Sequence, residues 1–337
     1  LDDYTSRFEL SGVEKFRSML LRSMKSGGVG SGASVATTGG PAAPAPVDVA
    51  PELEEPRPLD DLLEELDQLI GLEAVKEEVK LVAALLKVQQ LRADRGLPVI
   101  DSSRHLIFVG NPGTGKTTVA RLLAQIYRTL GVVDRGHLVE TDRSGLVAGF
   151  VGQTATKVVE VFDRADEGVL LIDEAYSLTR GGEKDFGREA IDAVVKLVED
   201  RRDRVVAILA GYPDEMRALV GANPGMASRF PRTIAFDDYS DGQLLAIFGL
   251  IASGQEYHLD ESGEQAVLAW FAAQERGRGF GNGRAARNLF EASVARHATR
   301  MLEQTEHTDE DLVTLTADDI GPPVAESDDH PGAAEPT

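Results

Sequence analysis

The chain has 337 residues, of which 42% are hydrophobic and 27% charged, and its 35 basic and 56 acidic side chains give a formal net charge of −21. This composition is typical of a soluble globular protein with room for one large domain or two. Since the chain contains no cysteine, disulfide scaffolds, thiol nucleophiles, iron–sulfur clusters and cysteine-based zinc sites are excluded. The negative charge argues against nucleic acid as a partner, and no apolar stretch is long enough for direct membrane insertion.

Two segments of different composition precede the globular part of the sequence. Apolar side chains spaced three and four residues apart predict a short helical remnant over 1–24. These side chains are Phe8, Leu10, Val13, Phe16, Met19 and Leu20. Residues 25–58 are rich in Gly, Ser, Ala and Pro, which predicts a flexible linker.

Apolar runs separated by helical patterns make up the next part of the chain. One helical pattern starts at Leu59 and ends at Gly71, and a second continues to about Arg95. Five apolar runs predict strands, and they occupy 105–110, 137–141, 168–173, 204–210 and 232–236. Strands that are apolar throughout and alternate with helices indicate a parallel sheet covered on both faces. The predicted fold class for 59–236 is therefore α/β, with a five-stranded parallel sheet.

The pattern changes after Tyr239, where the strand signals stop. Three helical stretches at about 240–253, 261–275 and 284–303 predict a small all-helical domain over 237–320. The segment 321–337 is rich in Pro, Ala and acidic residues, and this composition predicts a disordered tail.

A glycine-rich motif lies between the first predicted strand and the helix that follows it. The segment GNPGTGKT, from Gly110 to Thr117, matches the pattern GxxxxGK[ST]. In this setting the glycines let backbone N–H groups surround phosphate oxygens, and the helix N-terminus adds partial positive charge. Lys116 is expected to reach the β- and γ-phosphates and the Thr117 hydroxyl to bind Mg²⁺. A glycine-rich turn without nucleotide is the alternative interpretation.

The motif thus predicts ATP and Mg²⁺ as cofactors. The predicted phosphate-binding residues are Gly110, Asn111, Pro112, Gly113, Thr114, Gly115, Lys116, Thr117 and Thr118.

Two adjacent acids, Asp173 and Glu174, end another buried strand, GVLLIDEA. Ligands of open α/β sheets bind at this edge. Asp173 fits a carboxylate on the metal side, and Glu174 fits a base that orients or deprotonates attacking water. The same pair also fits an ordinary solvated strand end, so its catalytic interpretation depends on the phosphate loop.

The order of these motifs, followed by AGYPDEM, NPGMASRF and FGNGRAARNLFE, resembles the AAA+ ATPases and specifically the CbxX/CfqX family. That family includes red-type Rubisco activases, ATPases of type VII secretion and sporulation stage V K-like proteins. The resemblance covers about 59–320 and implies a P-loop NTPase core followed by a helical lid domain. It further implies a homo-oligomeric ring, by family resemblance a hexamer, that uses ATP hydrolysis to remodel or thread a protein client.

The resemblance also assigns roles to particular residues. Arg229 in NPGMASRF resembles an arginine finger that reaches the γ-phosphate bound by a neighbouring subunit. Arg284 resembles the sensor-2 arginine, with Arg287 as a second candidate one helical turn later. Ile70 and Gly71, together with Leu69, resemble the segment that lines the adenine pocket. A surface arginine, a solvated helix and core packing are the respective alternatives.

A central pore loop is the role implied for GLVAGFVGQT, in which Phe150, Val151 and Gly152 place an aromatic, an aliphatic and a glycine in a row. Such a sequence offers an apolar grip on a mobile backbone, whereas the alternative for Phe150 is an ordinary core aromatic. One departure from the family concerns sensor 1, a polar residue, often Asn, that ends the fourth strand. Tyr212 stands at that position, which leaves the sensor-1 role in doubt.

Three classes of function remain after these assignments. The leading hypothesis is a cytoplasmic, ring-forming ATPase that remodels protein. The second is an ATP-gated scaffold that hydrolyses slowly and holds or releases partners. A small-molecule kinase or GTPase is disfavoured, because the guanine-reading patterns NKxD and TKxD are absent. The family branch and the client are left open.

Overall fold

The computed structural model describes residues 55–99, 103–150, 152–180, 186–304 and 306–321. The chain divides into two compact units, Leu1–Glu52 and Leu53–Thr337, and every described residue belongs to the second. The predicted helix over 1–24, most of the linker over 25–58 and the tail from 322 lie outside the described residues.

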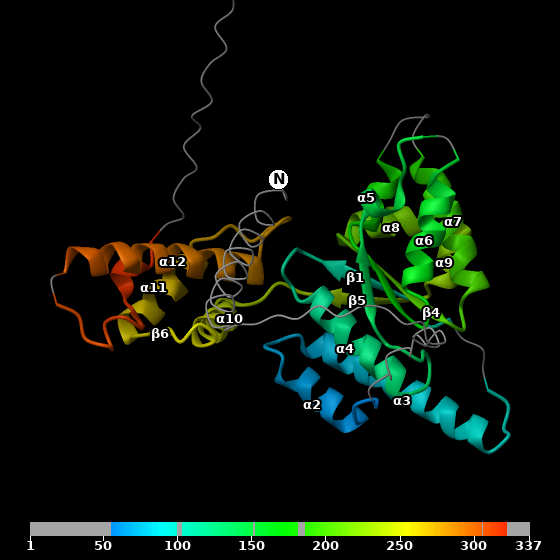
Figure 1. The fold of residues 1–337 in the computed structure, drawn as a ribbon, viewed down its shortest axis with the longest axis horizontal. Helices are drawn as coiled ribbons and strands as arrows, with labels where there is room; N and C mark the ends of the chain where they lie inside the picture. Colours follow the sequence, from blue (N-terminus) through cyan, green and yellow to red (C-terminus); the bar gives the residue numbers. More distant parts are fainter. Residues whose placement is uncertain (1–54, 100–102, 151, 181–185, 305, 322–337) are drawn as a thin grey trace, which may run out of the picture. The chain divides into compact units, whose positions relative to one another are not determined.

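A single parallel sheet of five strands, in the order β2-β3-β4-β1-β5, forms the centre of the described nucleotide-binding part (Figure 1). This confirms the predicted α/β class and the number of strands in that sheet. The strands are β1 (Leu106–Gly110), β2 (Leu138–Thr141), β3 (Gly168–Ile172), β4 (Val205–Gly211) and β5 (Arg232–Phe236). Because the sheet is parallel, the carboxyl ends of β1, β3 and β4 meet at one edge.

Helices cover both faces of this sheet, as the apolar runs predicted. On β1, Leu106 and Phe108 pack into the hydrophobic cluster on one face, whereas Ile107 and Val109 pack into the cluster on the other. Successive side chains of a strand point to opposite faces, so a strand buried on both sides is apolar at every position. The helices on the first face are α2 (Leu59–Gln68), α3 (Glu73–Asp94) and α4 (Lys116–Thr129).

The second face carries mostly shorter helices that follow the strands closely (Figure 1). They are α5 (Arg143–Leu146), α6 (Thr154–Arg164), the 3₁₀ helix η1 (Ala175–Thr179), α7 (Gly187–Asp200), α8 (Pro213–Ala222) and α9 (Pro224–Arg229).

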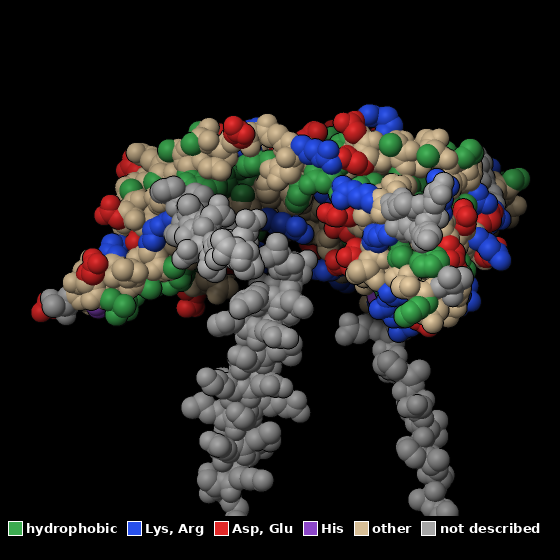
Figure 2. All heavy atoms as spheres, turned by 90° about the horizontal axis from the view of Figure 1, so that it is seen from above, with side chains coloured by type: hydrophobic (Ala, Val, Ile, Leu, Met, Phe, Trp, Pro, Cys, Tyr) green, Lys and Arg blue, Asp and Glu red, His purple; other side chains and the backbone are tan. Residues whose placement is uncertain are grey.

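On the face seen in Figure 2, acidic and basic side chains are interspersed over the described surface instead of forming one large field of a single sign.

The C-terminal part is built on three helices around a third cluster, in which Phe248, Phe271 and Phe290 are buried. The helices are α10 (Asp241–Ser253), α11 (Glu261–Ala272) and α12 (Gly283–Glu303). The expectation of helices alone was wrong in one respect. Two short strands, β6 (His258–Leu259) and β7 (Thr314–Leu315), pair in parallel, and strands of two residues are too short to produce a recognisable period.

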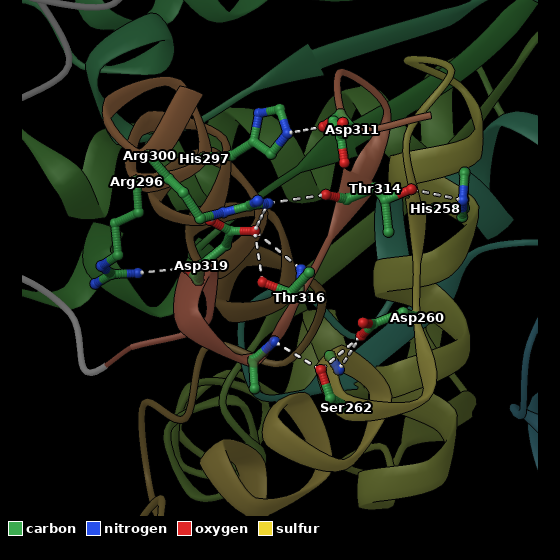
Figure 3. A network of polar contacts seen from close by, with 12 residues as sticks. His258, Asp260, Ser262, Arg296, His297, Arg300, Asp311, Thr314, Thr316 and Asp319 are labelled. Carbon is green, nitrogen blue, oxygen red and sulfur yellow. Dashed lines mark hydrogen bonds and ion pairs between the residues drawn. The ribbon is translucent and has the colours of Figure 1, made fainter. Parts of the chain in front are cut away.

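A network of polar contacts joins the segment after α12 to the helices (Figure 3). Asp319, which ends the 3₁₀ helix η2 (Ala317–Asp319), is 1% exposed. Its carboxylate accepts hydrogen bonds from Arg300 Nε at 2.9 Å and Arg300 Nη2 at 2.7 Å. It also accepts one from the Thr316 N–H at 2.9 Å. This buried ion pair fastens the C-terminal segment to α12.

Candidate nucleotide-binding site

The glycine-rich loop connects the end of β1 to the start of α4, at the carboxyl edge of the sheet. Two of its glycines are required by their neighbours. Gly110 has φ +153°, and a Cβ there would lie 2.3 Å from the carbonyl oxygen of Phe236. Gly113 has φ +71°, and a Cβ there would lie 2.2 Å from the carbonyl oxygen of Gly281. The loop is therefore closely packed against the end of β5 and against the loop before α12.

The first turn of α4 faces the loop with free backbone donors. Because α4 begins at Lys116, the N–H groups of Lys116, Thr117 and Thr118 have no carbonyl partner within the helix. Gly115 occupies the N-cap position and offers no side chain to satisfy them. Together with the partial positive charge of the helix terminus, these donors suit the oxygens of a phosphate group.

Lys116 brings a full positive charge to the same place. Its Nζ donates hydrogen bonds to the carbonyl oxygens of Gly110 at 2.9 Å and Asn111 at 2.7 Å. Burial lowers the pKa of Lys116, and the nearby positive charge of Arg284 adds to this effect, while Asp173 opposes it. The charges of Arg284 and Asp173 thus shift the pKa of Lys116 in opposite directions.

The two acids predicted from the sequence follow β3 directly. The Asp173 N–H donates to the Thr141 carbonyl at 2.8 Å, and its Oδ1 accepts from the Glu174 N–H at 2.9 Å. Glu174 is exposed and has φ +46°, in the left-handed region that non-glycine residues rarely adopt. Such backbone costs roughly 1–3 kcal/mol and is found preferentially at functional sites. The structure therefore places both carboxylates at the edge that carries Lys116.

The turn between α2 and α3 lies beside the phosphate loop. Gly71 and Leu72 both have positive φ values, of +62° and +64°, and the Leu69 carbonyl accepts a hydrogen bond from Lys76 Nζ at 2.6 Å. A Cβ at Gly115 would lie 3.3 Å from Leu72 Cδ1. Leu72 also packs against both the first and the third hydrophobic clusters. Sequence reasoning selected Ile70 and Gly71 but missed Leu72, whose left-handed backbone has no sequence signal.

The hinge, which is the segment 237–240 between β5 and α10, and the loop before α12 contact the phosphate loop directly. Sequence reasoning also missed these contacts. The Gly283 N–H donates to the Gly113 carbonyl at 3.0 Å, and the Tyr239 hydroxyl donates to the Thr114 carbonyl at 3.3 Å. Arg284 follows Gly283 at the start of α12 and is exposed. Because these pairs are far apart in sequence, only the folded chain reveals them.

Arg229 lies away from the phosphate loop of its own chain. It ends α9, and its carbonyl accepts a hydrogen bond from Ser103 Oγ, before β1. The phosphate loop leaves β1 at Gly110, the opposite end of the five-residue strand, which spans about 13 Å at roughly 3.3 Å per residue. Arg229 Nε lies 3.1 Å from Glu199 Oε2, an ion pair without the angle of a hydrogen bond.

The loop between α5 and α6 carries Phe150, which is 72% exposed. The interpretation of Phe150 as an ordinary core aromatic is therefore wrong. Both ends of the loop are anchored, since the Ala148 N–H donates to the buried Thr154 Oγ1 at 3.2 Å and Lys157 Nζ donates to the Val147 carbonyl at 3.1 Å. Gly152 has φ +79°, and Val151 lies outside the described residues.

Comparison with known proteins agrees with this geometry. Residues 106–238 match the family described as ATPase family associated with various cellular activities (AAA), and residues 240–330 match the AAA lid domain. The chain is 41% identical to stage V sporulation protein K of Bacillus subtilis over 265 residues, covering 78% of this chain and 82% of that protein. It is 43% identical to the chromosomal protein CbxX of Cupriavidus necator over 264 residues, covering 77% and 83%.

The chain belongs to the CbxX/CfqX family of AAA ATPases. It is also 40% identical to the chloroplastic ribulose bisphosphate carboxylase/oxygenase activase of Cyanidioschyzon merolae over 266 residues, which cover 78% of this chain and 91% of that one. The crystal structure of the FIGL-1 AAA domain in complex with ADP superposes with a TM-score of 0.54 at 18% identity, covering 77% of this AAA ATPase and 85% of that chain. That likeness concerns the fold.

Tyr212, at the position that the family resemblance gives to sensor 1, follows β4. The Arg278 guanidinium carbon lies 5.0 Å from the centre of the Tyr212 ring, and the Tyr176 ring centre lies 5.8 Å from it. Arg278 also forms an ion pair with Glu215 in α8. Tyr212 thus lies between the segment after Glu174 and the lid.

Among the described helices, none combines the length and the apolar character needed to cross a bilayer.

Proposed function

We propose that this AAA ATPase forms a ring, by family resemblance a hexamer, that hydrolyses ATP with Mg²⁺ and remodels or threads a protein client. The observation that carries the proposal is the exposure of Phe150 on a loop whose two ends are hydrogen-bonded. An exposed aromatic on an anchored loop gives an apolar contact that tolerates many peptide sequences. The relative named as an activase of ribulose bisphosphate carboxylase/oxygenase supports action on protein.

The residues of the phosphate loop fit the phosphates of ATP. The glycine-rich backbone and the first-turn donors of α4 would bind phosphate oxygens, while Lys116 supplies the charge that pairs with them. Thr117 and Asp173 offer a hydroxyl and a carboxylate, and oxygen ligands of this kind suit Mg²⁺. Bound Mg²⁺ neutralises charge on the β- and γ-phosphates. The remaining members of the proposed loop are Gly110, Asn111, Pro112, Gly113, Thr114, Gly115 and Thr118.

Two further side chains act on the γ-phosphate side of this site. Glu174 is exposed beside Asp173 and would take a proton from, or orient, the attacking water. The Gly283 N–H, next to Arg284, donates to the Gly113 carbonyl of the phosphate loop at 3.0 Å, which supports Arg284 over Arg287 as the sensor-2 arginine. Ile70 and Gly71 would line the adenine pocket, because their turn lies beside the phosphate loop.

The position of Arg229 supports a ring. The arginine and the phosphate loop lie at opposite ends of β1, so Arg229 serves the nucleotide of an adjacent subunit. An arginine that acts in this way is worth about 10³ to 10⁵ in rate. The ion pair with Glu199 holds the guanidinium near the end of α9.

A mixing experiment tests the trans-acting arginine. Glu174→Gln and Arg229→Ala are each expected to be nearly inactive, but a mixture of the two is expected to regain ATPase activity. In the mixed ring a Glu174→Gln subunit supplies its intact arginine to a neighbour that has an intact Glu174. Arg217→Ala is the matched control, because Arg217 is an exposed arginine on α8 with 77% of its side chain accessible. An arginine that served its own subunit would give a mixture as inactive as its parts.

A second experiment separates the remodelling motor from the ATP-gated scaffold. Phe150→Ala is expected to retain ATP hydrolysis and to lose unfolding of a tagged protein substrate by at least about tenfold, since it removes the apolar contact. Leu302→Ala removes another exposed apolar side chain, which is 87% accessible on α12, and is expected to retain both activities. Full remodelling by Phe150→Ala would exclude the pore-loop role of Phe150. Partner binding that depends on ATP and is unchanged in Phe150→Ala, without unfolding of the substrate by either protein, would favour the scaffold.

We further propose a division of the chain into a nucleotide-binding domain over 59–236 and a lid over 237–320. A cytoplasmic location, and the absence of nucleic acid among the partners, stay predictions that rest on ATP use and on the net charge of −21.

A further inference from the structure

Three polar side chains from distant parts of the chain meet beside the phosphate loop. Asn111 belongs to that loop, Asp238 to the hinge between β5 and α10, and Asn282 to the residue before α12. Asp238 Oδ1 accepts hydrogen bonds from Asn111 Nδ2 at 2.9 Å and from Asn282 Nδ2 at 2.7 Å. We call these three residues the Asn–Asp–Asn junction. A single carboxylate thus connects the phosphate loop to the lid.

Asn282 is the most constrained member of the junction. It is fully buried and has φ +48° and ψ −121°, a backbone conformation that side-chain-bearing residues rarely adopt. Its amide is used on both sides, because Oδ1 accepts from the Tyr239 N–H at 2.9 Å and Nδ2 also donates to the Phe280 carbonyl at 3.1 Å. Glycine would relieve the backbone strain, but only a side-chain amide provides these contacts.

Asn111 adds a second connection between the two loops. Its Nδ2 donates to the Gly277 carbonyl at 3.1 Å, and its Oδ1 accepts from the Gly279 N–H at 3.1 Å. The backbone bond from Gly283 to Gly113 lies between these contacts and Arg284. These hydrogen bonds couple the loop 277–282 to the phosphate loop on one side and to Gly283 and Arg284 of α12 on the other. A displacement of 277–282 that keeps these bonds therefore moves one of those two segments.

We propose that Asp238 and Asn282 are positioning residues that fix the phosphate loop and Arg284 relative to each other, so that the lid responds to phosphate bound in the loop. They act through Gly113 and Arg284 and are not expected to touch the nucleotide. The inference rests on the proposed function, because it requires ATP phosphates at this loop. A merely structural hinge would affect stability while leaving the affinity for ATP unchanged.

A charge exchange within the junction tests this inference. Asn282→Asp places a second carboxylate beside Asp238, and we expect it to raise KM for ATP at least about tenfold, since the two carboxylates repel each other and the hydrogen bond between them is lost. Asp238→Asn is expected to have a smaller effect, because one acceptor oxygen remains. The double variant restores one amide facing one carboxylate, and its KM is expected to return to within about threefold of the wild-type value.

Two measurements besides activity accompany the kinetics. Calorimetry gives the Kd for ATP, and amide hydrogen exchange of 277–284 in the nucleotide-free chain reports whether the loop is held. Exchange is expected to rise in Asn282→Asp and to fall again in the double variant. Asn111→Ala is the second variant in case Asn282→Asp does not fold, because Asn111 has no strained backbone; it is expected to raise both exchange and KM.

Asp319→Asn is the matched control, since it makes the same change at a buried carboxylate of the lid far along the chain from the phosphate loop. It is expected to lower the melting temperature while leaving KM for ATP unchanged. Two results would overturn the inference. One is an equal increase in KM for ATP in Asn282→Asp and in the double variant. The other is unchanged hydrogen exchange of 277–284 in both Asn282→Asp and Asn111→Ala. A wild-type chain that binds no ATP would overturn the proposed function, and the exchange data would still show whether the junction holds the loop.

Discussion

A titratable side chain, His105, is buried where the charge of Arg229 acts on it. His105 precedes β1, is 3% exposed, and its Nδ1 accepts a hydrogen bond from the Ala207 N–H at 3.0 Å. Burial lowers the pKa of His105 from 6.5 to about 4; a hydrogen bond with the Val198 backbone opposes this shift, and the charges of Arg104 and Arg229 add to it. The ring is therefore neutral in the folded chain at pH 7.

Acid pH is expected to destabilise the fold through His105. Between pH 6.5 and about 4 the unfolded chain binds a proton that the folded chain excludes, so this stability is present above pH 6.5 and is lost as the pH falls. From pH 7.5 to pH 5 the loss is roughly 2 kcal/mol. Urea unfolding at both pH values measures it.

The control for this prediction is His105→Phe, which cannot titrate. It leaves the Ala207 N–H without its acceptor, so it is expected to be about 1–3 kcal/mol less stable at pH 7.5. Its further loss on going to pH 5 is expected to be roughly 2 kcal/mol smaller than that of the wild-type chain. An equal loss in both proteins would contradict the assignment to His105.

Whether a helix or strand can be predicted from the sequence depends on the length of that element. The strands β1, β3 and β4 were predicted because each supplies side chains to both hydrophobic clusters, as β1 does with Phe108 and Val109. The edge strand β5 was predicted although only Ile234 and Phe236 are buried. The pair β6 and β7 was missed because two residues have no period. In the site, Lys116 and Asp173 follow from local motifs, whereas the contact of Asn282 with Pro112 joins residues 170 positions apart and has no local signal.

The attachment of the segment after α12 gives a prediction at the same scale. Burial alone would raise the pKa of Asp319, but hydrogen bonds from Arg300 and Thr316 outweigh it and the net pKa is lowered. Asp319→Ala leaves the Arg300 guanidinium, 23% exposed, without its partner. This is expected to cost about 3 kcal/mol, seen as a lower melting temperature of the lid. Asp318→Ala, at the exposed neighbouring position, is the control and is expected to melt like the wild-type chain.

For the whole molecule, the net charge of −21 opposes the proposed ring, because subunits of the same sign repel each other. Salt screens this repulsion, since the Debye length falls from about 30 Å at 0.01 M to about 10 Å at 0.1 M. We therefore expect the protein concentration that gives half-maximal ATPase activity per subunit to decrease when the added salt is raised from about 10 mM to about 100 mM. Mass measured by light scattering in ATP checks that assembly follows activity. A midpoint that rises with salt would show that interfacial ion pairs dominate.

In the proposed ring, the separation of Arg229 from its own phosphate loop also determines how many complete catalytic sites an assembly contains. A subunit whose arginine serves its neighbour contributes its phosphate loop to one catalytic site and its arginine to the next one. An open row of subunits then always has one fewer complete site than it has subunits, because the phosphate loop at one end lacks an arginine. Closing the row completes that last site. The final subunit added would therefore complete two sites at once. In an open row the fraction of inactive sites would be the inverse of the number of subunits, so short rows would have the lowest activity per subunit.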